Sequence, residues 1–334
     1  MMTPRPFSSA VGLVMTRYLA LKQALGRRYA NERAVLQSLD ACLAGDGGRR
    51  SGLTLVTFTR WTQTLGRLTP TVRRNRLRIV RNFCLYRRRT APAGFVPDPA
   101  LFPPPHPPRQ PYIFTEEEIA RLLGATRTLA RTPGSPLRPD VFRLALVLLY
   151  TTGLRRGELL RLTIGDYDPR DRTLLVRESK FHKSRVLPLS PDAVRELEAY
   201  LQVRRRRHLP VSAELPLLWN GYRGGRAYSG HGLGQGFRVL LTAARIRPPD
   251  GRLPRIHDAR HSFAVHALLR WYRAGDDPQA KLPLLATYMG HVSIASTHYY
   301  LPFVEPLGTA ANLRFAARYG ALLGPGLTRP GGGS

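Results

Sequence analysis

The first 95 residues show apolar positions at the spacing of amphipathic helices. The pattern predicts one helix that ends near Gly26 and a second from Asn31 to Leu43, stopped by the glycines after it. A third helix follows Thr54, and a fourth spans Thr69 to Arg89. In each, apolar residues recur three or four positions apart and so share one face. Residues 1–96 are therefore expected to form a helical domain.

Proline dominates residues 97–111, which predicts a stiff, extended linker between two domains. Thr115 followed by Glu118 is typical of a capping box, in which the two residues cap each other's backbone N–H groups. The pair predicts that a helix of the second domain starts there.

In the second domain, Asp140 to Tyr150 reads as a long core helix that Gly153 ends. The next helix opens at Gly157, which leaves Arg155 at the junction. Residues 172–189 change to the short apolar runs of a strand, a polar turn and a second strand.

Helices resume at 191–207, after His257 and around 282–288, while the Gly-rich segment 219–236 reads as a loop. The connection 271–283 reads as long and polar. The fold class expected is mainly α with a small β-sheet, the second domain being α+β.

The net charge of +30, from 52 Lys and Arg against 22 Asp and Glu, changes the picture. Such an excess repels itself unless it meets an anion, so a polyanion such as nucleic acid is the expected partner. An anionic membrane surface is an alternative. A codon bias explains why only four lysines are present, but it exchanges Lys for Arg and does not create an excess over acids.

Two cysteines far apart, Cys42 and Cys84, favour buried thiols in a reducing compartment over a disulfide or a zinc site. The first ten residues lack the apolar segment of a signal peptide. The longest apolar run, Leu144 to Tyr150, is too short to span a bilayer. We expect a cytoplasmic protein without a membrane partner.

The fourth helix carries eight arginines and no acidic residue. A solvated helix face is the simpler interpretation, but the bias favours contact with DNA phosphates. The candidate DNA-binding residues of this helix are Arg73, Arg74, Arg76, Arg78 and Arg81.

The hairpin tip holds two of the four lysines, Lys180 and Lys183, with Arg185 just beyond. Because Lys can release a proton and Arg effectively cannot, Lys180 is a candidate general acid, although charged hairpin tips are common. Lys183, Arg185 and the loop residue Arg226 are candidate DNA contacts. Arg155, beside a helix start, can bind a phosphate or can be an ordinary surface arginine.

The remaining candidates are close to the C-terminus. His257 and Arg260, in the cluster His257-Asp258-Ala259-Arg260-His261, are three positions apart and share a helix face. His291 follows Gly290 and precedes Tyr300 by nine positions. Taken singly, histidines such as His257 and His291 are more often structural than catalytic, and a tyrosine pair near a C-terminus usually serves packing.

The chain resembles the tyrosine recombinase (phage integrase) family in the order of its motifs. These are Gly-Leu-Arg-x-x-Glu-Leu, the lysine hairpin ending Val-Leu-Pro-Leu, His-x-x-Arg-His, Gly-His and the later Tyr. The resemblance covers residues 114–303 approximately. The sequence of residues 288–297 is similar to that of recombinases of mobile elements. It implies a catalytic domain at 112–303, a DNA core-binding domain at 1–96 and a C-shaped clamp around duplex DNA.

The resemblance also implies catalysis without metal or cofactor. Arg155 and Arg260 would stabilise the scissile phosphate, Tyr300 would attack it to form a 3′-phosphotyrosine, and Lys180 would protonate the departing 5′ oxygen. His257 would accept or donate a proton and His291 would hydrogen-bond the phosphate. Because Tyr299 directly precedes Tyr300, the choice of Tyr300 as the nucleophile rests on its spacing of nine positions from His291.

The family works as tetramers on paired sites, with sibling recombinases as further partners, and a tail helix within 304–334 would dock on a neighbour or cap its own domain. Two alternatives stay open: a type IB topoisomerase-like enzyme, and a non-catalytic DNA-binding accessory factor.

Overall fold

The computed structural model describes residues 6–27, 29–45, 52–105, 110–177, 184–248 and 250–291, together with Thr297 and Tyr300. The chain divides into two compact units, Met1–Arg109 and Gln110–Ser334. The division falls inside the Pro-rich segment 97–111. The predicted tail helix at 304–334 lies outside the described residues.

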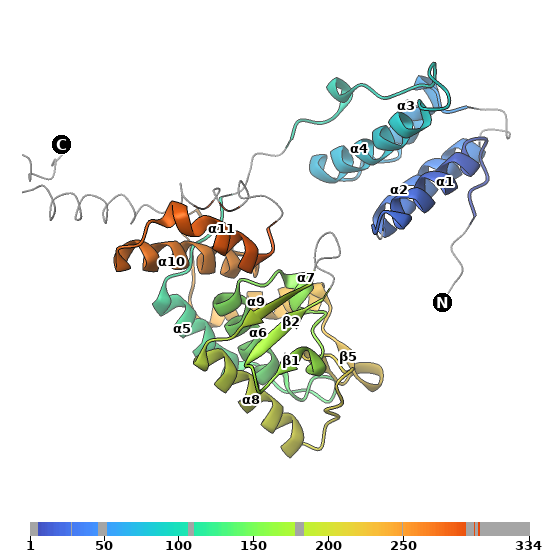
Figure 1. Cartoon of the computed structure of the whole chain (residues 1–334). Helices are drawn as coiled ribbons and strands as arrows, with labels where there is room; N and C mark the ends of the chain where they lie inside the picture. The colour runs from blue at the N-terminus through green and yellow to red at the C-terminus, as the bar shows by residue number, and fades with distance from the viewer. Residues whose placement is uncertain are drawn as a thin grey trace, which may run out of the picture. The chain divides into compact units, whose positions relative to one another are not determined.

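The first unit contains the predicted helices (Figure 1), namely α1 (Gly12–Ala24), α2 (Ala30–Ala44), α3 (Leu55–Gln63) and α4 (Pro70–Arg87), followed by the 3₁₀ turn η1 (Pro99–Leu101). The helices bury one apolar face each around Tyr18, Trp61 and Phe83. Thr54 caps α3 by accepting a hydrogen bond from the Thr57 amide. Cys84 is buried and Cys42 is half-buried, and both thiols are free.

The helical segments of the second unit are α5 (Glu116–Ala125), η2 (Thr126–Thr128), α6 (Arg138–Thr152), α7 (Arg156–Leu159), η3 (Ile164–Asp166), α8 (Pro191–Arg206), η4 (Tyr222–Gly224), α9 (Gly230–Ala243), α10 (Asp258–Ala274) and α11 (Pro278–Met289). The predicted capping box is confirmed: the Glu118 amide donates to Thr115 Oγ1 at 3.2 Å, and the Thr115 amide to Glu118 Oε2 at 3.0 Å.

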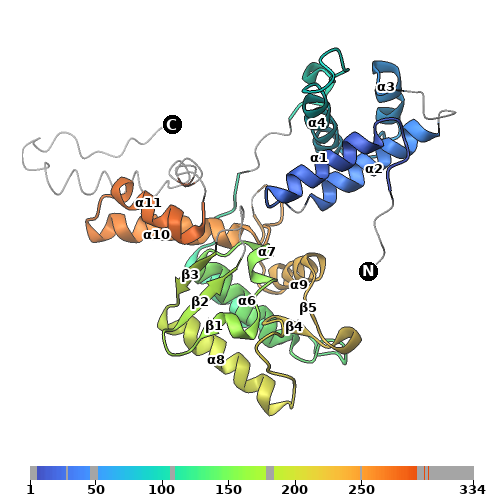
Figure 2. The same ribbon diagram turned by 45° about the vertical axis from the view of Figure 1, so that its right-hand side comes forward.

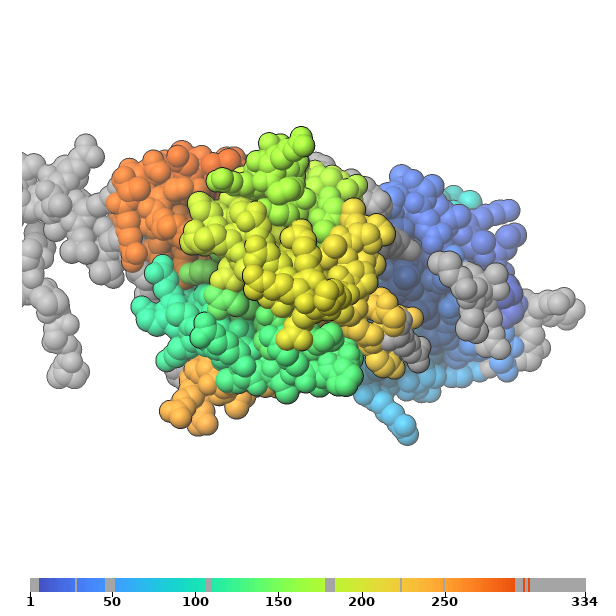
Figure 3. Space-filling view, turned by 90° about the horizontal axis from the view of Figure 1, so that it is seen from below, coloured from blue at the N-terminus to red at the C-terminus, as the bar shows by residue number. Residues whose placement is uncertain are grey.

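The apolar helix α6 forms the centre of the second unit. It packs against α8, α10 and α9, while α10 also packs against α11 (Figure 2). α8 and the segment after it cover one face, beside the segment from α5 to the start of α6 (Figure 3). Nearly every residue of α6 from Val141 to Leu149 is buried, which explains why its sequence is apolar on all sides.

Two small antiparallel sheets complete the unit. In the first, β1 (Tyr167–Asp168), β2 (Thr173–Val176) and β3 (Arg185–Pro188) are adjacent in that order, and Val176 pairs with Arg185 at the base of the hairpin. The second pairs β4 (Trp219–Asn220) with β5 (Arg226–Ala227). The predicted hairpin and the fold class, mainly α with a small sheet, are confirmed, whereas β1 was missed.

Two predictions about connecting segments are wrong. The Gly-rich segment 219–236 is not a continuous loop, because α9 begins at Gly230, capped by Ser229, whose Oγ accepts from the Gly232 amide at 3.0 Å. A Cβ at Gly236 would lie 2.0 Å from Cζ of Phe142, so this glycine permits close packing of α9 on α6. The connection 271–283 is mostly helix, with only 275–277 between α10 and α11.

Candidate active site

The candidate residues of the second unit gather where several helices end. α6 ends at Gly153 and α11 ends at Gly290, with φ of 60° and 67°, a conformation that glycine adopts without strain. Arg155 is the N-cap of α7, His257 is the N-cap of α10, and His291 directly follows the turn at Gly290. These ends meet because α10 packs on both α6 and α11.

Arg155 is held on two sides. Its Nη1 donates to Glu158 Oε1 at 2.7 Å, and its Nη2 donates to the carbonyl oxygen of Gly290 at 2.7 Å. The side chain keeps 26% of its surface exposed. The guanidinium is therefore fixed in orientation and still reachable from solvent, which suits an anion-binding group.

Glu158 lies at the centre of the cluster and is 3% exposed. Burial by itself raises the pKa of this carboxyl group, but hydrogen bonds from Arg185 and Arg155 outweigh it and lower the pKa to about 2. Glu158 is therefore a buried carboxylate that anchors two arginines.

Arg260 is almost fully buried, at 1% exposure. Its Nη1 donates to the carbonyl oxygen of Gly153 and its Nη2 to that of Met289, the latter at 2.9 Å. Burial, followed by the charge of Arg155, lowers the pKa of Arg260 to about 10, so it remains a cation at neutral pH. A buried cation that is bonded only to neutral carbonyl groups is stabilised when an anion binds beside it.

Tyr300 is also buried, at 3% exposure, against imidazoles. Its ring lies nearly parallel to that of His291, with 6.1 Å between centroids, and 5.4 Å from the ring of His261. His261 in turn meets His257 edge-on at 5.0 Å. A hydrogen bond of 2.7 Å between His291 Nδ1 and Thr297 Oγ1 fixes the plane of the His291 ring.

The three imidazoles are neutral at pH 7. Burial lowers the pKa of His257, His261 and His291 to about 4 in each case. Nearby cations add to this effect: Arg260 for His291, and Arg255 for His261. Neutral imidazoles can accept a proton from a phenol, and two arginines can hold an anion next to it.

The structure thus brings Arg155, His257, Arg260, His291 and Tyr300 into one cluster. Lys180 and Lys183 lie outside the described residues. Arg185 points into the protein, with 13% of its side chain exposed. Arg226 lies on β5 and is exposed. The sequence predicted no role for His261, the last residue of the cluster that begins at His257. Its spacing of four from His257 could have indicated that both imidazoles share a helix face.

The arginines of α4 differ among themselves. Arg74 and Arg81 donate from Nη1 to the carbonyl oxygens of Pro103 and Pro97, each at 2.5 Å, and so attach the Pro-rich segment to the helix. Arg78 is exposed, while Arg73 and Arg76 are half-buried. The sequence could not separate these roles, because the carbonyl partners come from a segment with no helical periodicity.

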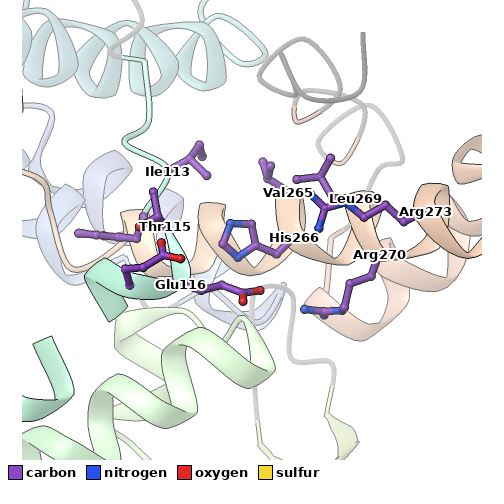
Figure 4. A pocket seen from close by; sticks show the side chains of 10 residues that line it. Ile113, Thr115, Glu116, Val265, His266, Leu269, Arg270 and Arg273 are labelled. Carbon is purple, nitrogen blue, oxygen red and sulfur yellow. The ribbon is translucent and has the colours of Figure 1, made fainter. Parts of the chain in front are cut away.

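A separate cavity of about 480 Å³ lies between the start of α5 and α10 (Figure 4). Its lining carries charges of both signs, Glu116 and Glu117 against Arg270 and Arg273, and it contains none of the predicted catalytic residues. Across the described part of the chain, no three His, Cys, Asp or Glu residues lie together as metal ligands would. No helix in that part is long and apolar enough to cross a membrane.

The model of the phage integrase family matches residues 113–303. A putative integrase/recombinase of Sinorhizobium fredii, y4rB, is 33% identical over 304 residues, which cover 90% of this chain and 96% of the relative. The chain belongs to the phage integrase family. It is accordingly a tyrosine-type, site-specific recombinase.

Further relatives agree with this assignment. The tyrosine recombinase XerD of Xanthomonas campestris pv. campestris is 30% identical over 300 residues, covering 84% of this chain and 86% of that one. Among solved structures, the Tn1549 transposon integrase in complex with a circular intermediate DNA has a TM-score of 0.58 at 18% identity, covering 88% and 95% of the two chains. The XerH recombinase bound to its difH substrate has a TM-score of 0.57 at 19% identity, covering 84% and 78%. At these identities the structures show the shared fold.

Proposed function

We propose that this recombinase cuts and rejoins double-stranded DNA through a covalent 3′-phosphotyrosine intermediate on Tyr300. The observation that carries the proposal is the position of Tyr300, buried against the neutral His291 in the cluster that also holds Arg155 and the buried cation Arg260. A phenol in one cluster with two arginines and neutral imidazoles has what attack on a phosphodiester requires.

In the proposed step, the phenolic oxygen of Tyr300 forms a bond to phosphorus and the bond from phosphorus to the 5′ oxygen breaks. The phenol proton passes to His257, and Lys180 supplies a proton to the departing 5′ oxygen. Arg155 and Arg260 stabilise the charge on the non-bridging oxygens, and His291 donates a hydrogen bond to one of them. Attack by the 5′ hydroxyl of a partner strand reverses the step and conserves the phosphodiester bond.

Duplex DNA is the proposed partner, in agreement with the net charge of +30. The exposed Arg78 and Arg226, together with Arg73, Arg76 and Lys183, are proposed backbone contacts, and Arg74 and Arg81 combine that role with the bonds to the Pro-rich segment. A tetramer on paired sites, cooperation with sibling recombinases and a cytoplasmic location remain predictions.

Covalent trapping tests the proposal. The substrate is a duplex with the ends of the mobile element that carries the gene, and a 5′-bridging phosphorothiolate at the cleavage position prevents religation. Wild type and Tyr299→Phe are expected to form a 3′ adduct, and Tyr300→Phe is not. Loss of the adduct only in Tyr299→Phe would move the nucleophile by one residue. Tight binding without an adduct in any protein would favour an accessory factor, and relaxation of plasmids without the specific ends would favour a topoisomerase.

A further inference from the structure

The guanidinium of Arg185 is hydrogen-bonded to acceptors inside the protein. Its Nε donates to the carbonyl oxygen of Tyr288 at 2.9 Å, its Nη2 to Glu158 Oε2 at 2.9 Å, and its Nη1 to Glu158 Oε1 at 3.3 Å. Each of its three nitrogens therefore has an acceptor inside the protein. Only 13% of the side chain is exposed, which is half the value for Arg155.

These contacts join three elements. Arg185 is the first residue of β3 and pairs with Val176 of β2, and Lys180 belongs in sequence to the segment that connects these two strands. Glu158 belongs to α7 and also holds Arg155. Tyr288 lies in the last turn of α11, just before the turn that leads to His291. One guanidinium thus connects the bases of the segments that carry a lysine, an arginine and a histidine of the proposed mechanism.

The turn at Gly290 is shaped around this guanidinium. A Cβ at Gly290 would lie 2.7 Å from Arg185 Nη1 and 3.0 Å from its Cζ, too close for a side chain. The same turn presents the carbonyl oxygen that accepts a hydrogen bond from Arg155. The φ of 67° favours glycine at this position, and a side chain here would also displace the guanidinium of Arg185.

We propose that Arg185 is a positioning residue that holds Glu158 and the end of α11 in register with the hairpin, and that it is not a DNA contact. This replaces the role expected from the sequence, where an arginine beside the hairpin lysines suggested phosphate binding. The inference rests on the proposed function, because the groups that Arg185 orders are those assigned to the phosphate and the proton transfers.

The test separates binding from cleavage. Arg185→Lys keeps the charge, so a phosphate contact would largely survive, but a lysine ammonium cannot reproduce a planar fork on Glu158 and a third bond to Tyr288. We expect the rate of adduct formation under single-turnover conditions to fall at least about tenfold. The dissociation constant for the DNA, and its dependence on salt, are expected to stay at the wild-type values.

The matched control is Arg177→Lys. Arg177 directly follows β2, the strand that pairs with β3, and its side chain also bonds a buried acid, Asp166. Unlike that of Arg185, the side chain of Arg177 is 63% exposed. Its adduct rate and binding are expected to be unchanged. The double variant Glu158→Gln/Arg185→Lys should be no slower than the slower single variant, because both changes break the same unit. Thermal unfolding of each variant shows whether the fold is intact, and if Arg185→Lys does not fold, Glu158→Gln must show the selective loss of rate.

Wild-type cleavage by Arg185→Lys would overturn the inference. So would weaker DNA binding by Arg185→Gln, which removes the charge, with a salt slope reduced by about one. A wild-type protein without any adduct would instead count against the proposed function. For that case, the Nε–H resonance of Arg185 provides an independent readout. If Arg185 is a positioning residue, this proton exchanges slowly with solvent in the free protein and its resonance does not shift when DNA is added. If Arg185 contacts a phosphate, the proton exchanges rapidly in the free protein and its resonance shifts on binding.

Discussion

The Nη2 atom of Arg155 donates a hydrogen bond of 2.7 Å to the carbonyl oxygen of Gly290, 135 residues later in the chain. The bond fixes the first arginine of the candidate site to the turn that presents His291. Arg260 donates to the next carbonyl upstream, that of Met289, at 2.9 Å. Both arginines are thus anchored to the end of α11.

Replacing Arg155 by Lys tests this anchoring. A lysine ammonium is a compact group and cannot reproduce the planar fork that reaches Glu158, Gly290 and a phosphate, so we expect adduct formation to slow by about 10²–10³, the loss typical for a group that stabilises transition-state charge. Binding of the DNA should change little. Arg156→Lys is the control, because Arg156 is the exposed neighbour in the same helix. Equal losses in both variants would contradict a specific role for Arg155.

The imidazole cluster predicts a pH dependence of stability. The pKa values of His257, His261 and His291 are about 4 in the folded protein and about 6.5 in an unfolded chain. Between these values the unfolded chain binds more protons, so the free energy of unfolding falls as the pH drops from about 6.5 to about 4.

Denaturant unfolding at several pH values measures this slope. His261→Phe removes one titrating group and should flatten the slope by up to about 1.4 kcal/mol per pH unit. His208→Asn is the control, since His208 is exposed and its φ of 52° is one that asparagine tolerates. An unchanged slope in His261→Phe would show that this imidazole is not neutral in the folded state.

The glycines of α9 provide a test of packing. Gly236→Ala places a Cβ 2.0 Å from Cζ of Phe142, and we expect a loss of about 1–3 kcal/mol in the free energy of unfolding. Gly234 lies two residues before Gly236 in the same helix, with open space around its Cβ position, so Gly234→Ala should stabilise the helix by about 0.5–1 kcal/mol. Thermal or urea unfolding measures both, and a neutral Gly236→Ala would mean that α9 can shift on α6.

The arginines of α4 are expected to separate into two groups. Arg81→Ala removes the bond to the carbonyl oxygen of Pro97 and should lower the stability of the first unit by about 1 kcal/mol. Arg78→Ala removes an exposed side chain, so stability should stay the same while the salt dependence of DNA binding falls by about one ion. Unfolding and binding at three salt concentrations check both, and a reversed pattern would refute the distinction.

The sequence predicted the local features well, because their signals are short-ranged. The capping box at Thr115, the end of α6 at Gly153 and the β2–β3 hairpin each depend on residues a few positions apart. The start of α9 was missed because glycine usually marks a loop, and the close contact with Phe142 that favours glycine there comes from a distant helix.

By itself, the sequence determined which chemical groups are present and in what order, since residue types and spacing carry that information directly. Only the tertiary structure decided that Glu158 is shared by Arg155 and Arg185, that Arg185 points inward, and that Tyr300 is buried against His291. These relationships join residues up to 103 positions apart, as in the bond from Arg185 to the carbonyl oxygen of Tyr288, through the packing of α6, α10 and α11. Side-chain direction and burial are set by that packing, and no local pattern in the chain encodes them.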